Sequence, residues 1–114
     1  MVNTVERPAA MQTDRLFEDG ELRVRFRCEE VAYLGFNVRL GLKPGYGVEW
    51  DRRGVNQISG PEHELVFRLK GEEVAATLDG SPLPVVIHSR NRSGTLHFGS
   101  VGGRLRIRSI DFRT

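Results

Sequence analysis

Hydrophobic and polar residues alternate along much of the chain, a pattern typical of β-strands with one buried face. In residues 21–28, every second residue is apolar and the residues between them are mostly charged. The apolar set of this segment is Leu22, Val24, Phe26 and Cys28. The same period of two recurs in residues 64–70 and 73–78. No window carries a convincing helical stripe, so we expect an all-β chain.

Glycine, aspartate and proline divide the chain into short segments. Lys70–Glu72 predicts a hairpin, and Asp79–Gly80 and Gly102–Gly103 predict tight turns. Pro82 and Pro84 cannot donate backbone hydrogen bonds, so the segment that holds them is expected at a sheet edge. Each turn therefore separates two expected strands.

The last alternating segment, residues 104–112, changes its register partway. Its apolar residues fall on odd positions up to Ile107 and on even positions from Ile110 onward. One extra residue would keep both sets on one face, so we predict a β-bulge near Arg108–Ser109. About nine short strands separated by turns predict an antiparallel sandwich or barrel.

The composition fits one globular domain without disulfides. The chain has 114 residues, 39% hydrophobic and 28% charged, with a single cysteine and a net charge of +2. We expect a flexible tail over residues 1–8 and one domain over residues 9–114. Near-neutral charge makes nucleic acid an unlikely partner, and no apolar run is long enough to cross a membrane. Without a signal-peptide pattern, a cytoplasmic location is expected unless the chain is a module cut from a larger protein.

Several motifs, in order over residues 9–113, resemble the 3-keto-disaccharide hydrolase family. The opening stretch, residues 11–27, is similar to the family's first long strand, and Gly35–Arg39 and Gly45–Trp50 are similar to its G-V-F-V-R and G-Y-E-V-Q-I strands. Residues 104–112 are similar to its closing strand. The resemblance implies a concanavalin A-like jelly roll, a β-sandwich.

The same resemblance carries over few functional residues. Arg39 and Tyr46 match the family pattern and are implied as ligand-binding residues, whereas Gly47 replaces the family's acidic residue. His97 stands out of place in the family's G-x-I-x-L-Q-x-H segment. The loops that build the family's deep cleft are too short here.

Glu49 and Asp51 are the candidate catalytic residues. Retaining glycosidases need two carboxylates about 5 Å apart, and related enzymes supply them through an E-x-D-x-x-E strand. Residues 49–54 begin this motif but end it in Gly54. Exposed carboxylates at the end of a strand are the alternative interpretation.

One face of residues 33–39 is polar and partly aromatic. Tyr33, Asn37 and Arg39 lie opposite the apolar residues of the segment, a pattern suited to stacking on a sugar and to hydrogen bonding its hydroxyls. With Tyr46 and His97 they form the predicted ligand-binding set. The alternative is a solvated sheet face on which Arg39 pairs with Glu49 or another neighbour.

Arginine accounts for 15 of the 17 basic residues. Two runs place it at every second position; they contain Arg23, Arg25 and Arg27, and Arg104, Arg106 and Arg108. If the two strands are neighbours, these side chains form one ladder that suits phosphate, sulfate or carboxylate, provided that the guanidiniums are unpaired. Cross-strand pairing with glutamates is the alternative.

The remaining residues predict no metal or cofactor. The three histidines, His63, His88 and His97, lack the spacing of metal ligands, and no nucleotide-binding motif is present. We therefore expect a small non-catalytic module that recognises a glycan or a protein. An active glycoside hydrolase and a polyanion-binding protein are the alternatives. The sequence leaves the glycan and the oligomeric state open.

Overall fold

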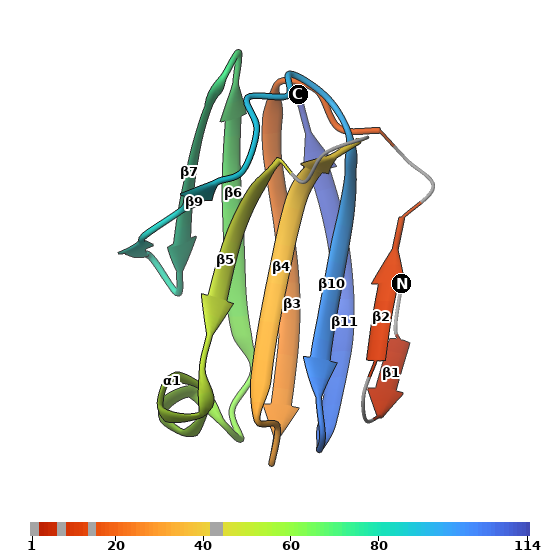
Figure 1. The fold of residues 1–114 in the computed structure, drawn as a ribbon, viewed down its shortest axis with the longest axis vertical. Coiled ribbons are helices and arrows are strands. Elements are labelled where there is room, and N and C mark those ends of the chain that lie inside the picture. Colours follow the sequence, from red (N-terminus) through yellow and green to blue (C-terminus); the bar gives the residue numbers. More distant parts are fainter. Residues whose placement is uncertain (1–2, 7–8, 14–15, 42–44) are drawn as a thin grey trace.

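Two antiparallel sheets pack face to face in the computed structural model, which describes residues 3–6, 9–13, 16–41 and 45–114 (Figure 1). The six-stranded sheet has the order β1 (Asn3–Glu6), β11 (Arg104–Arg113), β3 (Gly20–Glu29), β6 (His63–Lys70), β7 (Glu73–Leu78), β8 (Ser81–Leu83). The five-stranded sheet has the order β2 (Ala9–Gln12), β10 (Thr95–Val101), β4 (Tyr33–Leu40), β5 (Tyr46–Trp50), β9 (Val86–Ile87). The predicted antiparallel sandwich is confirmed.

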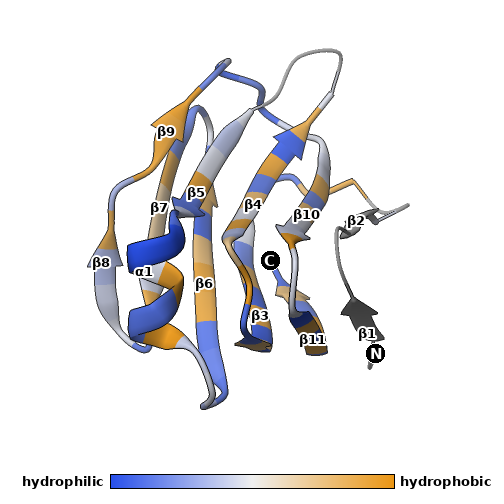
Figure 2. Cartoon of the chain, turned by 60° about the horizontal axis from the view of Figure 1, so that its bottom comes forward, coloured by the Kyte–Doolittle hydropathy of each residue, from blue (hydrophilic) through white to orange (hydrophobic). Residues whose placement is uncertain are grey.

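The core lies between the sheets and is built from the apolar sets expected in the sequence. Phe26, Phe67 and Ile107 are fully buried. Phe36 packs its ring against Phe26 and Phe98, with ring centroids 5.1 and 5.8 Å apart. Figure 2 shows the underlying alternation as hydrophobic and hydrophilic bands along β4. Cys28 is buried among these residues, as its register predicts.

The expected turns and the bulge are confirmed. Gly71 lies in the hairpin between β6 and β7, and Asp79 and Gly80 join β7 to β8 with φ angles of 50° and 88°. These positive angles match the twist of a two-residue hairpin. The register between β11 and β3 shifts between Ile107 and Ser109, where the change of parity places it. The shift keeps both apolar sets of β11 on the inner side.

The edges of the sandwich hold the short strands. Pro82 lies in β8 at one edge of the six-stranded sheet, as proline at that position predicts. Within the segment expected as a flexible tail, residues 3–6 form β1 and pair with β11. β1 and β2 lie at the same edge of the sandwich (Figure 1). The strands described within residues 9–114 thus form one sandwich, and β1, from the segment expected as a tail, adds an edge strand to it.

A short helix, α1 (Arg52–Ile58), was not predicted from the sequence. It begins where the Asp51 side chain accepts a hydrogen bond from the Gly54 amide at 2.8 Å, and Val55 and Ile58 are its buried residues. With seven residues and an internal glycine, the segment is too short to show a helical period. Asp51 provides the start signal, since aspartate is a preferred N-cap residue.

Candidate functional site

The outer face of the five-stranded sheet collects polar and aromatic side chains from three adjacent strands. Asn37 on β4 lies opposite His97 on β10 and Gly47 on β5. One step along the sheet, Gly35 lies opposite Gly99 and Glu49. A further step places Tyr33 opposite Val101. Tyr33, Asn37 and His97, which the sequence analysis singled out, therefore lie on one face.

Glycines allow two of these side chains to lie low across the sheet. A Cβ at Gly35 would come 2.9 Å from the Tyr33 hydroxyl oxygen, so the Tyr33 side chain crosses this position. A Cβ at Gly47 would come 2.5 Å from Asn37 Oδ1. Tyr33 and Asn37 thus keep orientations that larger residues at these two glycines would block.

Tyr33 and Glu49 form a coupled pair on this face. Burial raises the pKa of the Tyr33 hydroxyl, and the negative charge and the hydrogen-bond acceptor of the nearby Glu49 carboxylate raise it further. The phenol therefore stays protonated and the carboxylate keeps acceptor capacity for another donor.

His88 joins the face at its other end and was not assigned to the site from the sequence. Its Nε2 atom lies 3.6 Å from the position of a Cβ on Gly47, which places the ring beside Asn37. The His88 amide donates to the Gly45 carbonyl at 2.8 Å, which holds the residue against the start of β5. His88 follows the irregular segment that contains Pro82 and Pro84, where no alternation predicts which way a side chain points.

Arg39 does not belong to this face, which corrects the prediction. Between the pairs Thr95 with Leu40 and His97 with Asn37, β4 holds one residue more than β10, and Arg39 has a φ angle of 57°. This bulge separates Arg39 from the outward residues of its strand. The side chain is fully buried.

The buried Arg39 guanidinium connects three loops. Its Nη1 donates to the carbonyls of Gly71 and Asn91, and its Nη2 donates to Asp19 Oδ1 at 3.2 Å. Asp19 Oδ1 also accepts a hydrogen bond from the Gly71 amide. Arg39 therefore joins the loop before β3, the β6–β7 hairpin and the loop before β10, and it offers no group to an external ligand.

Tyr46 is likewise misassigned by the family resemblance. Its side chain is fully buried, and its hydroxyl donates to the Glu72 carbonyl. The residue packs in the core between the sheets. Arg39 and Tyr46, which the resemblance implied as ligand contacts, are thus both buried and hydrogen-bonded inside the fold.

The two candidate catalytic carboxylates have different surroundings. Asp51 caps α1 through its hydrogen bond to the Gly54 amide, whereas Glu49 pairs with Tyr33 on the sheet face. At the outward positions of β4, β5 and β10, Glu49 is the one carboxylate. Each of the two carboxylates thus has a contact of its own within the fold.

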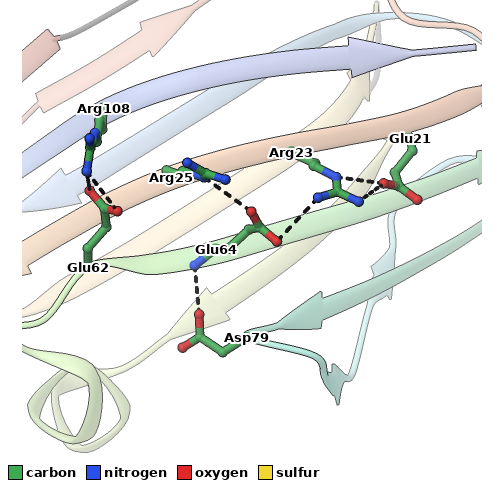
Figure 3. Close-up of polar contacts among 7 residues, drawn as sticks. All are labelled: Glu21, Arg23, Arg25, Glu62, Glu64, Asp79 and Arg108. Atoms are coloured by element: carbon green, nitrogen blue, oxygen red, sulfur yellow. Dashed lines mark hydrogen bonds and ion pairs between the residues drawn. The ribbon is translucent and has the colours of Figure 1, made fainter.

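The predicted adjacency of the two arginine-rich strands is confirmed on the opposite face of the molecule. β3 and β11 are neighbours, with Arg27 opposite Arg106. Glutamates interrupt the ladder, as Figure 3 shows. The ion pairs are Arg23 with Glu21 at 2.7 Å, Arg25 with Glu64 at 3.2 Å, and Arg108 with Glu62 at 3.1 Å. The six unpaired guanidiniums that a polyanion ladder requires are therefore absent from these described strands.

Both ring nitrogens of His63 contact groups within the fold. Its ring nitrogens lie 2.6 Å from Asp79 Oδ2 and 2.7 Å from the Ile58 carbonyl oxygen. Among the described residues, no three histidine, cysteine, aspartate or glutamate side chains gather as metal ligands would. In the same part of the chain, no helix has the length and apolarity to span a membrane.

One hollow lies away from the sheet face. It has a volume of about 530 Å³ and opens at the end of the sandwich where Arg39 joins the loops; its lining includes Leu16, Asp19, Gly71 and Phe112. Asp19 and Gly71 are already bonded to Arg39. None of the residues named on the outer sheet face lines this hollow, so the hollow is a separate feature.

Comparison with solved structures finds the same fold over nearly the whole chain. The galectin LEC-6 of Caenorhabditis elegans has a TM-score of 0.70 and 12% identity, over 98% of this chain and 96% of that one. The carbohydrate-binding module CBM66 of Bacillus subtilis has a TM-score of 0.72 and 7% identity, over 96% and 84%. The β-glucanase of Bacillus licheniformis has a TM-score of 0.65 and 8% identity, over 99% and 78%.

These similarities define the class of fold. The chain has the concanavalin A-like jelly-roll fold that the family resemblance implies, which is one form of the antiparallel sandwich or barrel that its strand pattern predicts. No protein-family model matches it, and no curated protein does. Because every one of these identities is low, they establish the fold and leave the activity to the residues of the site.

Proposed function

We propose that this protein binds carbohydrate on the outer face of its five-stranded sheet. The observation that carries the proposal is the gathering of Tyr33, Asn37, Glu49, His88 and His97 on one face of the sheet. Tyr33 is 37% exposed and supplies an aromatic surface for the C–H groups of a sugar. The amide, carboxylate and imidazole groups supply the donors and acceptors that sugar hydroxyls need.

The comparisons support this proposal at the level of the fold. CBM66 is by its name a carbohydrate-binding module, and the chain matches 84% of its length. The chain also matches nearly the full length of a galectin. A kinship with the 3-keto-disaccharide hydrolase family within this fold is part of the same proposal and rests on the sequence motifs.

We propose further that binding is not followed by hydrolysis. Glycosidases of the usual mechanism need a second carboxyl group beside the first. Glu49 has Tyr33 as its partner, and Asp51 is held at the start of α1. These contacts favour a recognition role for Glu49, as an acceptor of sugar hydroxyls.

A glycan array with purified protein tests the proposal. We expect weak binding to a neutral glycan that changes little with salt, because hydroxyl recognition releases few counterions. Tyr33→Ala and Asn37→Ala should each weaken it by about tenfold or more, the effect of losing one good contact. Arg108→Gln, on the opposite sheet, is the matched control and should bind as wild type.

The outcomes separate the alternatives. A folded wild type that binds no glycan, or face variants that bind as strongly as wild type, would contradict the proposal. A hydrolysis assay on glucosides and 3-keto-glucosides should show no turnover in the same preparation. Turnover that disappears in Glu49→Gln would establish the enzyme instead.

A further inference from the structure

Arg27 and Arg106 form an unusual pair on the outer face of the six-stranded sheet. They are direct cross-strand partners on β3 and β11. On the far side of Arg106, the residue opposite it on β1 is Thr4. In the described registers, this is the one rung on which two cations stand opposite each other and neither has an acid as its cross-strand partner.

The other basic residues on this sheet have an acid directly opposite. The cross-strand partners are Arg104 with Glu29 and Glu6, Arg113 with Glu21, Arg23 with Asp111, Arg25 with Glu64, Arg68 with Glu21, and Lys70 with Glu73. Arg108, at the bulge, is neutralised by Glu62. Arg27 and Arg106 are thus the basic residues at this sheet's described rungs without an acidic cross-strand partner, and the ion pair recorded at their rung is the 3.9 Å contact of Arg27 with Glu29 on its own strand.

The local contacts leave donors available at this rung. Arg27 Nε donates to the Gly60 carbonyl at 2.9 Å, which fixes the side chain, and its Nη2 lies a distant 3.9 Å from Glu29. Arg106 makes no ion pair or hydrogen bond with the residues that the structure describes. With Glu29 and Arg104 the two arginines surround a hollow of about 10 Å³. That volume is near the size of one water molecule or one oxygen of an anion.

Two like charges directly opposite destabilise a sheet unless something neutralises them. The planar fork of arginine suits the oxygens of sulfate and phosphate, which accept two parallel hydrogen bonds. We propose that Arg27 and Arg106 bind one tetrahedral oxyanion, a sulfate or phosphate group, between their guanidiniums. This site lies on the opposite sheet from the proposed carbohydrate face and is independent of it.

Titration with three separate probes tests the site and the source of the anion. The probes are inorganic sulfate, inorganic phosphate and glucose 6-sulfate, each added at constant ionic strength against sodium chloride. We expect saturable shifts of the Arg27 and Arg106 Nε–Hε NMR signals, with Arg23 and Arg108 unmoved. Tighter binding of the sugar ester than of free sulfate would assign the site to esterified ligands, and equal binding would assign it to the free ion.

Variants make the test specific. Arg106→Gln should weaken binding of the anion by about tenfold or more, because it removes one charged fork. Arg23→Gln, whose arginine is paired with Glu21, should bind as wild type. Equal binding by wild type and Arg106→Gln, or equal shifts of all arginine signals, would overturn the proposal.

A stability measurement checks the same rung without relying on a particular ligand. In low-salt buffer free of sulfate and phosphate, Arg106→Gln should melt at a higher temperature than wild type, because it removes the repulsion. Sulfate should then raise the melting temperature of wild type more than that of the variant. A variant that is less stable than wild type in both buffers would contradict the proposal.

Discussion

Arg39 shows at the scale of a single residue how one extra position in a strand changes a side chain's role. Simple alternation places it with Tyr33 and Asn37 on the outer face. The bulge before Leu40 and the φ angle of 57° place the guanidinium in the interior, bonded to two carbonyls and Asp19. Periodicity cannot detect such a bulge where no parity change marks it.

Arg39→Ala should therefore destabilise the fold. It leaves the carbonyls of Gly71 and Asn91 without this donor, and a buried acceptor that loses its donor costs about 1 to 3 kcal/mol. Urea unfolding measures the change, and Arg25→Ala on the surface should cost less than about 1 kcal/mol. A variant as stable as wild type that loses glycan binding would restore Arg39 to the ligand site.

Asp79 gives a second prediction at this scale, concerning pH. Burial acts to raise the pKa of its carboxyl, but hydrogen bonds from His63 and the Glu64 amide outweigh burial and hold the pKa below 3.8. A carboxyl with a lowered pKa in the folded state stabilises the fold above its unfolded pKa and loses that effect as the pH falls through its folded pKa.

Asp79→Asn should therefore be less stable than wild type at pH 5, and the difference should shrink as the pH falls below about 3.8. We expect a difference under about 1 kcal/mol, because the Asp79 side chain is 50% exposed. Denaturant unfolding at several acidic pH values measures it. A difference that grows on acidification would show that the carboxylate is not the stabilising form.

At the scale of the element, strands and turns follow from the sequence far better than the helix does. β3 and β6 alternate over many residues, and the parity change in β11 marks its own bulge. For the helix α1, the local signal in the sequence is a single aspartate, Asp51, before a seven-residue segment. Its position is decided by the packing of Val55 and Ile58, which no local pattern predicts.

Two substitutions of Asp51 test whether its carboxylate acts as a helix cap or as a catalytic group. Asp51→Ala should lower the free energy of unfolding by about 1 kcal/mol, because the Gly54 amide loses its acceptor. Asp51→Asn should be close to wild type, since asparagine caps equally well. Thermal unfolding of both variants checks this. Equal destabilisation by both substitutions would show that the carboxylate charge matters more than the cap.

At the scale of the whole molecule, the sandwich depends on one core between two sheets. The inward parity that predicted Phe67 is confirmed by its complete burial. Phe67→Ala should destabilise by about 3 to 5 kcal/mol, through lost burial and the cavity left behind. Urea unfolding compares it with Val86→Ala, an exposed edge residue that should change stability little. An unchanged midpoint for Phe67→Ala would mean that the sheets do not pack as described.

The candidate site was predicted in part. The alternation within each strand predicts the outward direction of Tyr33, Asn37 and His97, and this alternation is visible in the local sequence. The structure brings the three residues together across β4 and β10. His88 and the pairing of Tyr33 with Glu49 depend on which strands are neighbours, and that information is not local. The family resemblance gave the fold correctly but placed Arg39 and Tyr46 on the wrong side of it.

The carbohydrate face is tested most directly by mapping a bound sugar onto the molecule. An assigned NMR spectrum, titrated with a neutral oligosaccharide selected on the glycan array, reports which residues the ligand contacts. We predict that the shifts concentrate on Tyr33, Asn37, Gly47, Glu49 and His97. Shifts that concentrate on the six-stranded sheet or around the hollow at Phe112, with this face unmoved, would contradict the account.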